Sequence, residues 1–368
     1  MHPDVNLREA TFADYDQIVA VEASQKLRAR SRDEWTGLWL ENPFYRELEL
    51  GWPIGWVLEN EERRIVGTIG NIPIPYVFRG RKLLVAAGRA WAVEERYRSV
   101  ALMLMDTYFS QPNVDVFLNT TVNALAAEAF GVFGSRPVPA GDWSAASYWV
   151  TGYTGFARAA LRVKRVPLPA LLCVAAGACL YVKDVVAAKR IPATTPGIDV
   201  RRTTEFTGQF DDFWNQLATD SSSFLCVRTR EMLEWHFGSA LRRDEAWLFT
   251  VSDAGNLIAY AIFQRRDDAN TGLRRIRLVD FHALANSDDC LLTILGAALK
   301  LARQTGIHVL EKVGLDVEGT KPIDVHAPYR RKLGAWPFYY HAPDPELSAA
   351  LESRDAWQPS SFDGDASL

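Results

Sequence analysis

The chain has 368 residues, of which 48% are hydrophobic and 23% charged, a globular composition that excludes a disordered or fibrous chain. Lys and Arg number 41 against 45 Asp and Glu, so the net charge is −4 and nucleic acid is not expected as a partner. Because a domain usually has about 100–200 residues, the length predicts two domains.

The N-terminal residues and the cysteines indicate the cellular compartment. The opening 16 residues are polar and charged and lack the apolar core of a secretory signal. None of the four cysteines belongs to the paired Cys-x-x-Cys pattern of a zinc site, so no metal is expected. We therefore expect a reduced, cytoplasmic protein.

The first part of the chain alternates between strand-like and helix-like segments. Periodicity and capping residues predict strands over 5–10, 55–59, 65–72, 83–93 and 114–119. They predict helices that begin at Tyr15 and cover 32–40, 100–109 and 123–133.

An uncharged stretch from Val166 to Val182 follows. It contains two prolines and is shorter than the roughly 20 residues of a bilayer span. Three interpretations remain: a helix buried between two domains, which we prefer, a helix on a membrane surface with peripheral contact, and a true span. The polar, Pro-rich residues 191–197 are typical of a linker.

The second part repeats the order of the first. We predict strands over 198–202, 247–252, 257–265, 276–283 and 308–311, and helices over 210–217, 229–237 and 290–305. The predicted class is α/β, an α+β sandwich of two tandem domains, each a mixed twisted sheet flanked by helices. The expected division is 1–160, an apolar helix and linker over 161–197, a second domain over 198–345 and a tail over 346–368.

The segment 83–110 is the most informative for function. A long apolar strand is followed by Glu94-Glu95-Arg96-Tyr97-Arg98-Ser99-Val100-Ala101, which opens a helix. Free backbone N–H groups at a helix start, together with arginines, suit a pyrophosphate. An ordinary turn with two solvated arginines is the alternative.

Taken with the helix after Asn123, this segment resembles the GNAT superfamily of acyl-CoA-dependent N-acyltransferases. The family's loop reads Arg/Gln-x-x-Gly-x-Gly/Ala, where this chain has Arg96 to Ala101. Its later helix reads Asn-x-x-Ala-x-x-Leu-Tyr-x-x-x-Gly-Phe, and five residues fall at matching intervals: Asn123, Ala126, Ala129, Phe130 and Gly134. The resemblance covers about residues 4–150. The second part resembles a degenerate repeat, in which residues 329–334 are similar to the end of the corresponding helix.

The resemblance implies a set of cofactor contacts. Backbone amides from Arg96 through Tyr97, Arg98, Ser99 and Val100 to Ala101 are expected to hold the pyrophosphate of acetyl-CoA or another acyl-CoA. Ala92 and Val93 are expected to pair with the pantetheine amides, and Asn123 to contact the same arm. Two departures stand out. Ser99 replaces the loop glycine, and Phe130 occupies the position that often holds a general-acid Tyr.

The catalytic groups follow from the same comparison. Glu94 or Glu95 at the strand end is the expected base, and water, Tyr97 or Tyr108 is the candidate to protonate the thiolate. A solvated acidic turn is the alternative reading of the two glutamates. In the second part, Asp280 and His282 alternate on one strand, so they share a face and are candidates to orient an acceptor.

The sequence thus predicts an N-acyltransferase, in the first instance an N-acetyltransferase, whose acceptor is an amine of a small molecule, sugar or amino acid. Two alternatives stay open. One is a non-catalytic GNAT scaffold that acts as a binding or membrane-associated module. The other is an aminoacyl-tRNA-dependent transferase of the Fem type.

Overall fold

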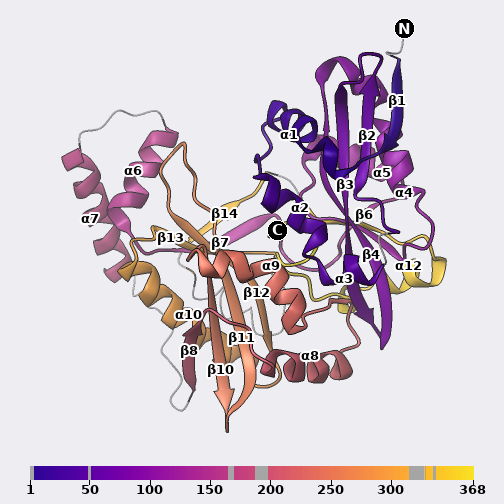
Figure 1. Cartoon of the computed structure of the whole chain (residues 1–368). Helices are drawn as coiled ribbons and strands as arrows, with labels where there is room; N and C mark the ends of the chain where they lie inside the picture. Colours follow the sequence, from indigo (N-terminus) through magenta and orange to yellow (C-terminus); the bar gives the residue numbers. More distant parts are fainter. Residues whose placement is uncertain are drawn as a thin grey trace.

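The computed structural model describes residues 4–48, 51–164, 170–186, 198–314, 327, 329–334 and 337–368. The predicted linker 191–197 and the first four residues of the apolar stretch, 166–169, lie outside the described residues. Figure 1 shows two sheets side by side, with helices on their outer faces and the C end of the chain between them.

The first sheet has the strand order β1-β2-β3-β4-β5-β15-β6, and β9 pairs with β3. Its pairs are antiparallel except β4 with β5, which are parallel. The strands are β1 (Val5–Glu9), β2 (Gly55–Asn60), β3 (Ile65–Phe78), β4 (Arg81–Val93), β5 (Val116–Asn119), β6 (Arg136–Pro137), β9 (Leu225–Cys226) and β15 (Tyr339–His341).

The second sheet has the order β14-β7-β13-β12-β11-β10-β8, with β12 and β13 parallel. Both sheets are mixed and flanked by helices, which confirms the predicted fold class. The strands are β7 (Ala145–Val150), β8 (Asp199–Thr203), β10 (Ala246–Asp253), β11 (Asn256–Arg265), β12 (Arg275–Ala283), β13 (Val309–Val313) and β14 (Tyr329–Lys332).

Some of the helices begin at a side-chain cap. Ser31 and Glu34 form a reciprocal capping box at the start of α2, and the Asn42 side chain accepts from the first amides of α3. The helices are α1 (Tyr15–Ser24), α2 (Arg32–Leu40), α3 (Pro43–Glu47), α4 (Leu102–Phe109), α5 (Ala124–Val132), α6 (Tyr153–Val163), α7 (Ala170–Val186), α8 (Gln209–Asp220), α9 (Arg230–Arg242), α10 (Ser287–Gln304) and α12 (Pro345–Leu351). Short 3₁₀ turns are η1 (Phe12–Asp14), η2 (Glu95–Val100) and η3 (Arg354–Ala356).

Strand pairing crosses the predicted domain division. β7 lies within 1–160 but pairs with β13 and β14 of the second sheet. β15 lies within 198–345 but pairs with β5 and β6 of the first. Each half therefore completes the sheet of the other, while the exact domain boundaries stay a prediction.

One large apolar core joins the two sheets. It extends from the first sheet through α9 to side chains of β11 and the segment 352–368, including Leu233, Tyr260 and Trp357. A second core lies between the second sheet and α10. The predicted tail 346–368 is thus largely buried and contributes to the core.

Two sequence predictions are wrong. Residues 329–334 were expected to end a helix, but Tyr329–Lys332 is a strand, because β7 offers it an edge. The apolar stretch was expected as a helix buried between domains. The observed α7 instead lies with α6 in a lobe at the side of the molecule (Figure 1), and seven of its large apolar side chains are exposed.

Candidate active site

The parallel strands β4 and β5 separate in the middle of the first sheet. They pair only over Val85–Ala87 of β4, and beyond that point β4 keeps its pairing with β3 alone. The register with β3 shifts near Ala90, whose φ of +51° lies in the left-handed region. Such a bulge bends a strand and re-aims its side chains.

Gly88 stands at the point of separation. A Cβ atom there would lie 2.3 Å from Asn119 Oδ1 and 3.1 Å from the Tyr108 hydroxyl oxygen. Only glycine therefore fits between these two side chains.

The gap between the strands holds a cavity of about 100 Å³, which we call the strand-split cavity. The Trp91 indole N–H beside it has no hydrogen-bond partner among the described residues. The cavity is lined by Leu27, Ile69, residues 88–91, Asn119, residues 121–123, Ala126 and Phe130. It is a slot lined by both apolar and polar side chains, with an unpaired strand edge and a free donor.

A buried ion pair between Arg89 and Glu22 lies beside the strand-split cavity. Arg89 of β4 donates to both carboxylate oxygens of Glu22, at 2.8 and 3.4 Å, and the Glu22 side chain is 1% exposed. Glu22 interrupts the apolar face of α1, and its partner explains why a charge is tolerated there.

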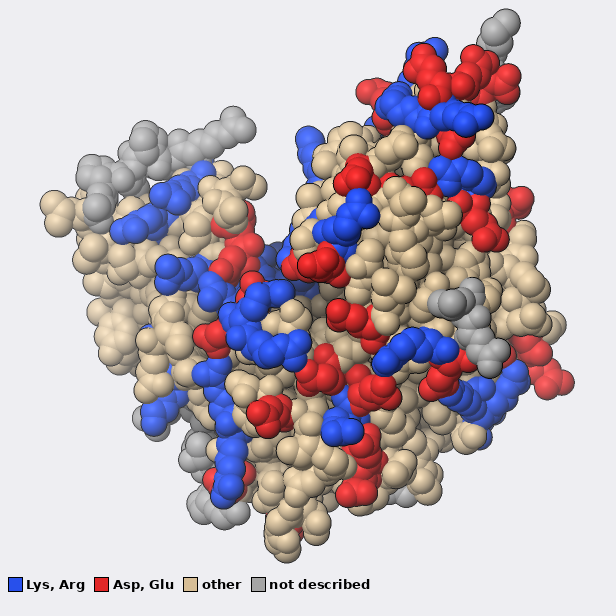
Figure 2. All heavy atoms as spheres, viewed as in Figure 1, with Lys and Arg blue, Asp and Glu red and all other residues tan. Residues whose placement is uncertain are grey.

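A second, larger cavity of about 360 Å³ opens between α2 and α9, and we call it the α2–α9 cavity. Its wall carries three arginines, four carboxylates, His236, Ser367 and Leu368. Leu27 lines the first cavity and Arg28 the second, so the two cavities are neighbours. Figure 2 shows the surface hollowed between the two halves of the molecule, with Lys and Arg along the hollow.

Two arginines near this cavity have no carboxylate partner within the part of the chain that the structure describes. Arg30 donates to the Leu368 carbonyl oxygen and Arg266 to that of Ala366. Burial, and then the charges of neighbouring arginines, lower the pKa of each to about 10. Main-chain oxygens of residues 366–368 therefore hold these two guanidinium groups.

Asp365 lines neither cavity itself, but a hydrogen-bond partner of it lines the first cavity and a near neighbour in the chain lines the second. It accepts from the hydroxyls of Thr120, at 2.9 Å, and Thr121, which lines the strand-split cavity, while Ser367 lines the α2–α9 cavity. Burial raises the pKa of the Asp365 carboxyl, against the opposing effects of the Thr120 hydrogen bond and the Arg89 charge. A carboxyl group of raised pKa at such a position is suited to accept a proton.

Only some of the cofactor-binding residues predicted from the sequence line the strand-split cavity. Asn123 and Phe130 lie at the strand-split cavity; Asn123 also caps α5 by accepting from the Ala126 amide. Ala92 and Val93 follow the bulge and are buried. Asp365, which sequence reasoning missed, belongs to a distant segment that no local motif marks.

The predicted anion loop is the 3₁₀ turn η2, followed by α4. The amides of Tyr97 and Ala101 already donate to the carbonyls of Glu94 and Arg98. Arg96, Arg98 and Ser99 are exposed, Val100 is buried, and Ser99 keeps the negative φ that its replacement of glycine requires.

The predicted catalytic groups of this loop line none of the four cavities found in the described residues. The Glu94 carboxylate is bound by both terminal nitrogens of Arg64. Glu95 is exposed, and the buried Tyr97 hydroxyl accepts from Asn60 at 3.4 Å. Their catalytic roles stay predictions.

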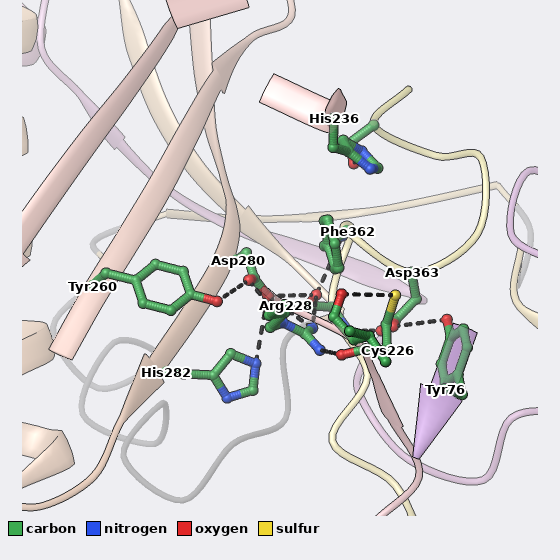
Figure 3. Close-up of polar contacts among 12 residues, drawn as sticks. Tyr76, Cys226, Arg228, His236, Tyr260, Asp280, His282, Phe362 and Asp363 are labelled. Atoms are coloured by element: carbon green, nitrogen blue, oxygen red, sulfur yellow. Dashed lines mark hydrogen bonds and ion pairs between the residues drawn. The ribbon is translucent and has the colours of Figure 1, made fainter. Parts of the chain in front are cut away.

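Asp280 and His282 belong to a buried polar network (Figure 3). Asp280 is 0% exposed and accepts from Arg228 Nε at 3.0 Å, Arg228 Nη2 at 3.1 Å, Tyr260 at 2.7 Å and Ser360 at 2.9 Å. His282 Nε2 lies 3.6 Å from the same carboxylate. Neither lines a cavity found in the described residues, so contact with an acceptor would require this network to open.

The network fastens residues 360–363 to both sheets. Asp363 accepts from the Ser360 amide at 2.7 Å and from Tyr76 of β3 at 2.9 Å, while Asp280 belongs to β12. Figure 3 shows Tyr76 and Tyr260 pointing inward from opposite sides. The segment that carries Asp365 is thereby held in place.

The described residues include no group of three His, Cys, Asp or Glu side chains arranged to hold a metal ion. Within the same residues, no helix combines the length and apolarity needed to cross a bilayer.

Comparisons with solved structures identify the fold: the chain has the fold of the GCN5-related N-acetyltransferases. Members from Anabaena variabilis and Kribbella flavida each align with a TM-score of 0.57 at 12% and 11% identity, covering 93% and 95% of this chain and 73% of each of theirs. N-myristoyltransferase of Saccharomyces cerevisiae with bound myristoyl-CoA aligns with a TM-score of 0.55 at 12% identity, over 94% of this chain and 86% of its own. No protein-family model and no curated protein sequence matches the chain.

Proposed function

We propose that this protein is an N-acyltransferase that moves a short acyl group, in the first instance acetyl, from acyl-CoA to an amine of a small molecule, sugar or amino acid. The observation that carries the proposal is the strand-split cavity, a slot of mixed lining with an unpaired strand edge beside a larger polar cavity. The neighbouring structures of acetyl- and myristoyl-transferases support the reaction class.

The acyl-CoA would enter along β4. Its pantetheine amides would pair with the free edge from Gly88 to Val93, as an added strand does, and the Trp91 N–H would donate to a carbonyl. Arg96 and Arg98 are exposed where the strand ends and would bind the phosphates. The small volume of the slot favours a short acyl group over a long chain.

The acceptor would occupy the α2–α9 cavity, whose lining of both signs suits a polar amine. Its nitrogen attacks the thioester carbonyl, the C–N bond forms, the C–S bond breaks, and the ammonium proton passes to a base. Asp365 is our preferred base because it accepts from Thr121, which lines the strand-split cavity, and its pKa is raised. The Tyr108 hydroxyl, beside Gly88, donates to the Ala86 carbonyl and is a candidate to protonate the thiolate.

A glycine pair tests the cofactor site. In Gly88→Ala the new methyl group collides with Asn119, so we expect acetyl-CoA to bind at least about tenfold more weakly by calorimetry. Gly131→Ala in α5, where no atom lies within 4 Å of the added carbon, is the matched control and should bind normally. Equal acetyl-CoA affinities in the two variants would contradict the placement of the cofactor in this cavity.

Thiol release from acetyl-CoA with a panel of amines tests the base. Asp365→Asn should lose about 10²–10⁴-fold in turnover while keeping acetyl-CoA affinity. Glu94→Gln and Glu95→Gln test the bases expected from the sequence in the same assay. Full turnover in Asp365→Asn would exclude that residue, and tight CoA binding by a wild type that releases no thiol would favour the non-catalytic scaffold.

A further inference from the structure

The helix α7 exposes an unusual amount of apolar surface. Eight of the fourteen large apolar side chains that are exposed in the described part of the chain belong to the α6–α7 lobe. These are Val163, Leu171, Leu172, Val174, Tyr181, Val182, Val185 and Val186, with exposed fractions of 48–81%. A patch of this kind on a globular protein marks an interaction surface.

Only one narrow stripe of α7 packs against the rest of the protein. Cys173, Gly177 and Asp184 are buried, and Gly177 lies so close to α6 that an added Cβ would be 2.9 Å from the Thr154 backbone. Asp184 accepts from Tyr153 at 3.0 Å and Tyr329 at 2.6 Å. These contacts fix the helix to the protein and leave its apolar face outward.

The charged side chains exposed on α6 and α7 have a single sign. Arg158, Arg162, Lys164 and Lys183 are exposed on α6 and α7, whereas the one acidic residue of the two helices, Asp184, is buried. Residues 153–190 contain seven Lys or Arg and one Asp in a chain whose net charge is −4. In Figure 2 much of this side of the molecule is covered by residues other than Lys, Arg, Asp and Glu, with several basic side chains among them.

We infer that the α6–α7 lobe is a docking surface for an anionic lipid bilayer, with α7 lying in the plane of the interface. An apolar helix face bordered by Lys and Arg is the combination that binds acyl chains and acidic headgroups together. A symmetric contact with a second copy would bring two basic surfaces against each other. The inference does not depend on the acyltransferase proposal.

The test is co-flotation of the full chain with phosphatidylcholine vesicles that contain or lack phosphatidylserine. We expect binding to the anionic vesicles only, with at least a fivefold decrease as salt rises from about 0.1 M to about 0.5 M. The variant Leu171→Glu/Val182→Glu should bind at least tenfold less, because both side chains are exposed and its fold should be unaffected.

The matched control is Val132→Glu on α5, also exposed, which should float like the wild type. Failure of the wild type to float with anionic vesicles would overturn the inference. So would equal loss of flotation in the control variant. A wild-type dimer in light scattering that the double variant converts to a monomer, without lipid binding, would assign the surface to a second copy instead.

Discussion

The buried contact between Arg228 and Asp280 is predicted to dominate the stability of the junction between the two sheets. Both side chains are at most 1% exposed, and Asp280 accepts four hydrogen bonds of 2.7–3.1 Å. Asp280→Asn removes the main counter-charge of the buried Arg228 guanidinium, to which Asp280 is hydrogen-bonded through two nitrogens. Loss of one partner from a buried ion pair costs about 3–5 kcal/mol, and we expect the free energy of unfolding to fall by that amount.

Urea unfolding at pH 7, followed by circular dichroism, measures the effect. Asp253→Asn, at the exposed end of β10 in the same sheet, is the control and should change stability by less than about 0.5 kcal/mol. Tyr260→Phe removes a single hydrogen bond to the carboxylate and should cost about 1.5–3 kcal/mol. The double variant Arg228→Met/Asp280→Leu should recover most of the loss. If Asp280→Asn unfolds within about 1 kcal/mol of Asp253→Asn, the network does not hold the sheets together.

Two further predictions concern charge. Arg96→Glu should weaken acetyl-CoA binding by about 1.5–3 kcal/mol in calorimetry. An unchanged affinity would show that η2 does not bind the phosphates of the cofactor. Burial lowers the pKa of both His236 and His282 to about 3, so below about pH 6.5 the unfolded chain binds protons that the folded chain does not. Stability should therefore fall as the pH drops from about 6.5 towards about 3. The variant His236→Gln/His282→Gln should show a shallower fall in urea titrations, and an identical slope would contradict the buried, neutral state of these rings.

Much of the local structure could be read from the sequence. Alternation predicted β2, β3, β4, β10, β11 and β12, and helix-like patterns over 32–40 and 229–237 anticipated α2 and α9. The resemblance to the GNAT superfamily anticipated the fold. It also singled out Asn123 and Phe130, which line the strand-split cavity. These features are local because periodicity and caps act within a few residues.

The exchange of β7 and β15 between the sheets, and the contact of Asp365 with Thr120, were decided by tertiary structure alone. The same holds for Glu22, whose charge looked like a defect in α1 until β4 supplied Arg89. The exposure of α7 could not be predicted from the sequence either. An apolar helix has the same sequence pattern whether its apolar side chains pack within the protein or lie at its surface. Each of these features joins segments far apart in the chain, and such pairing depends on which strand edge and which buried charge remain free once the core has formed.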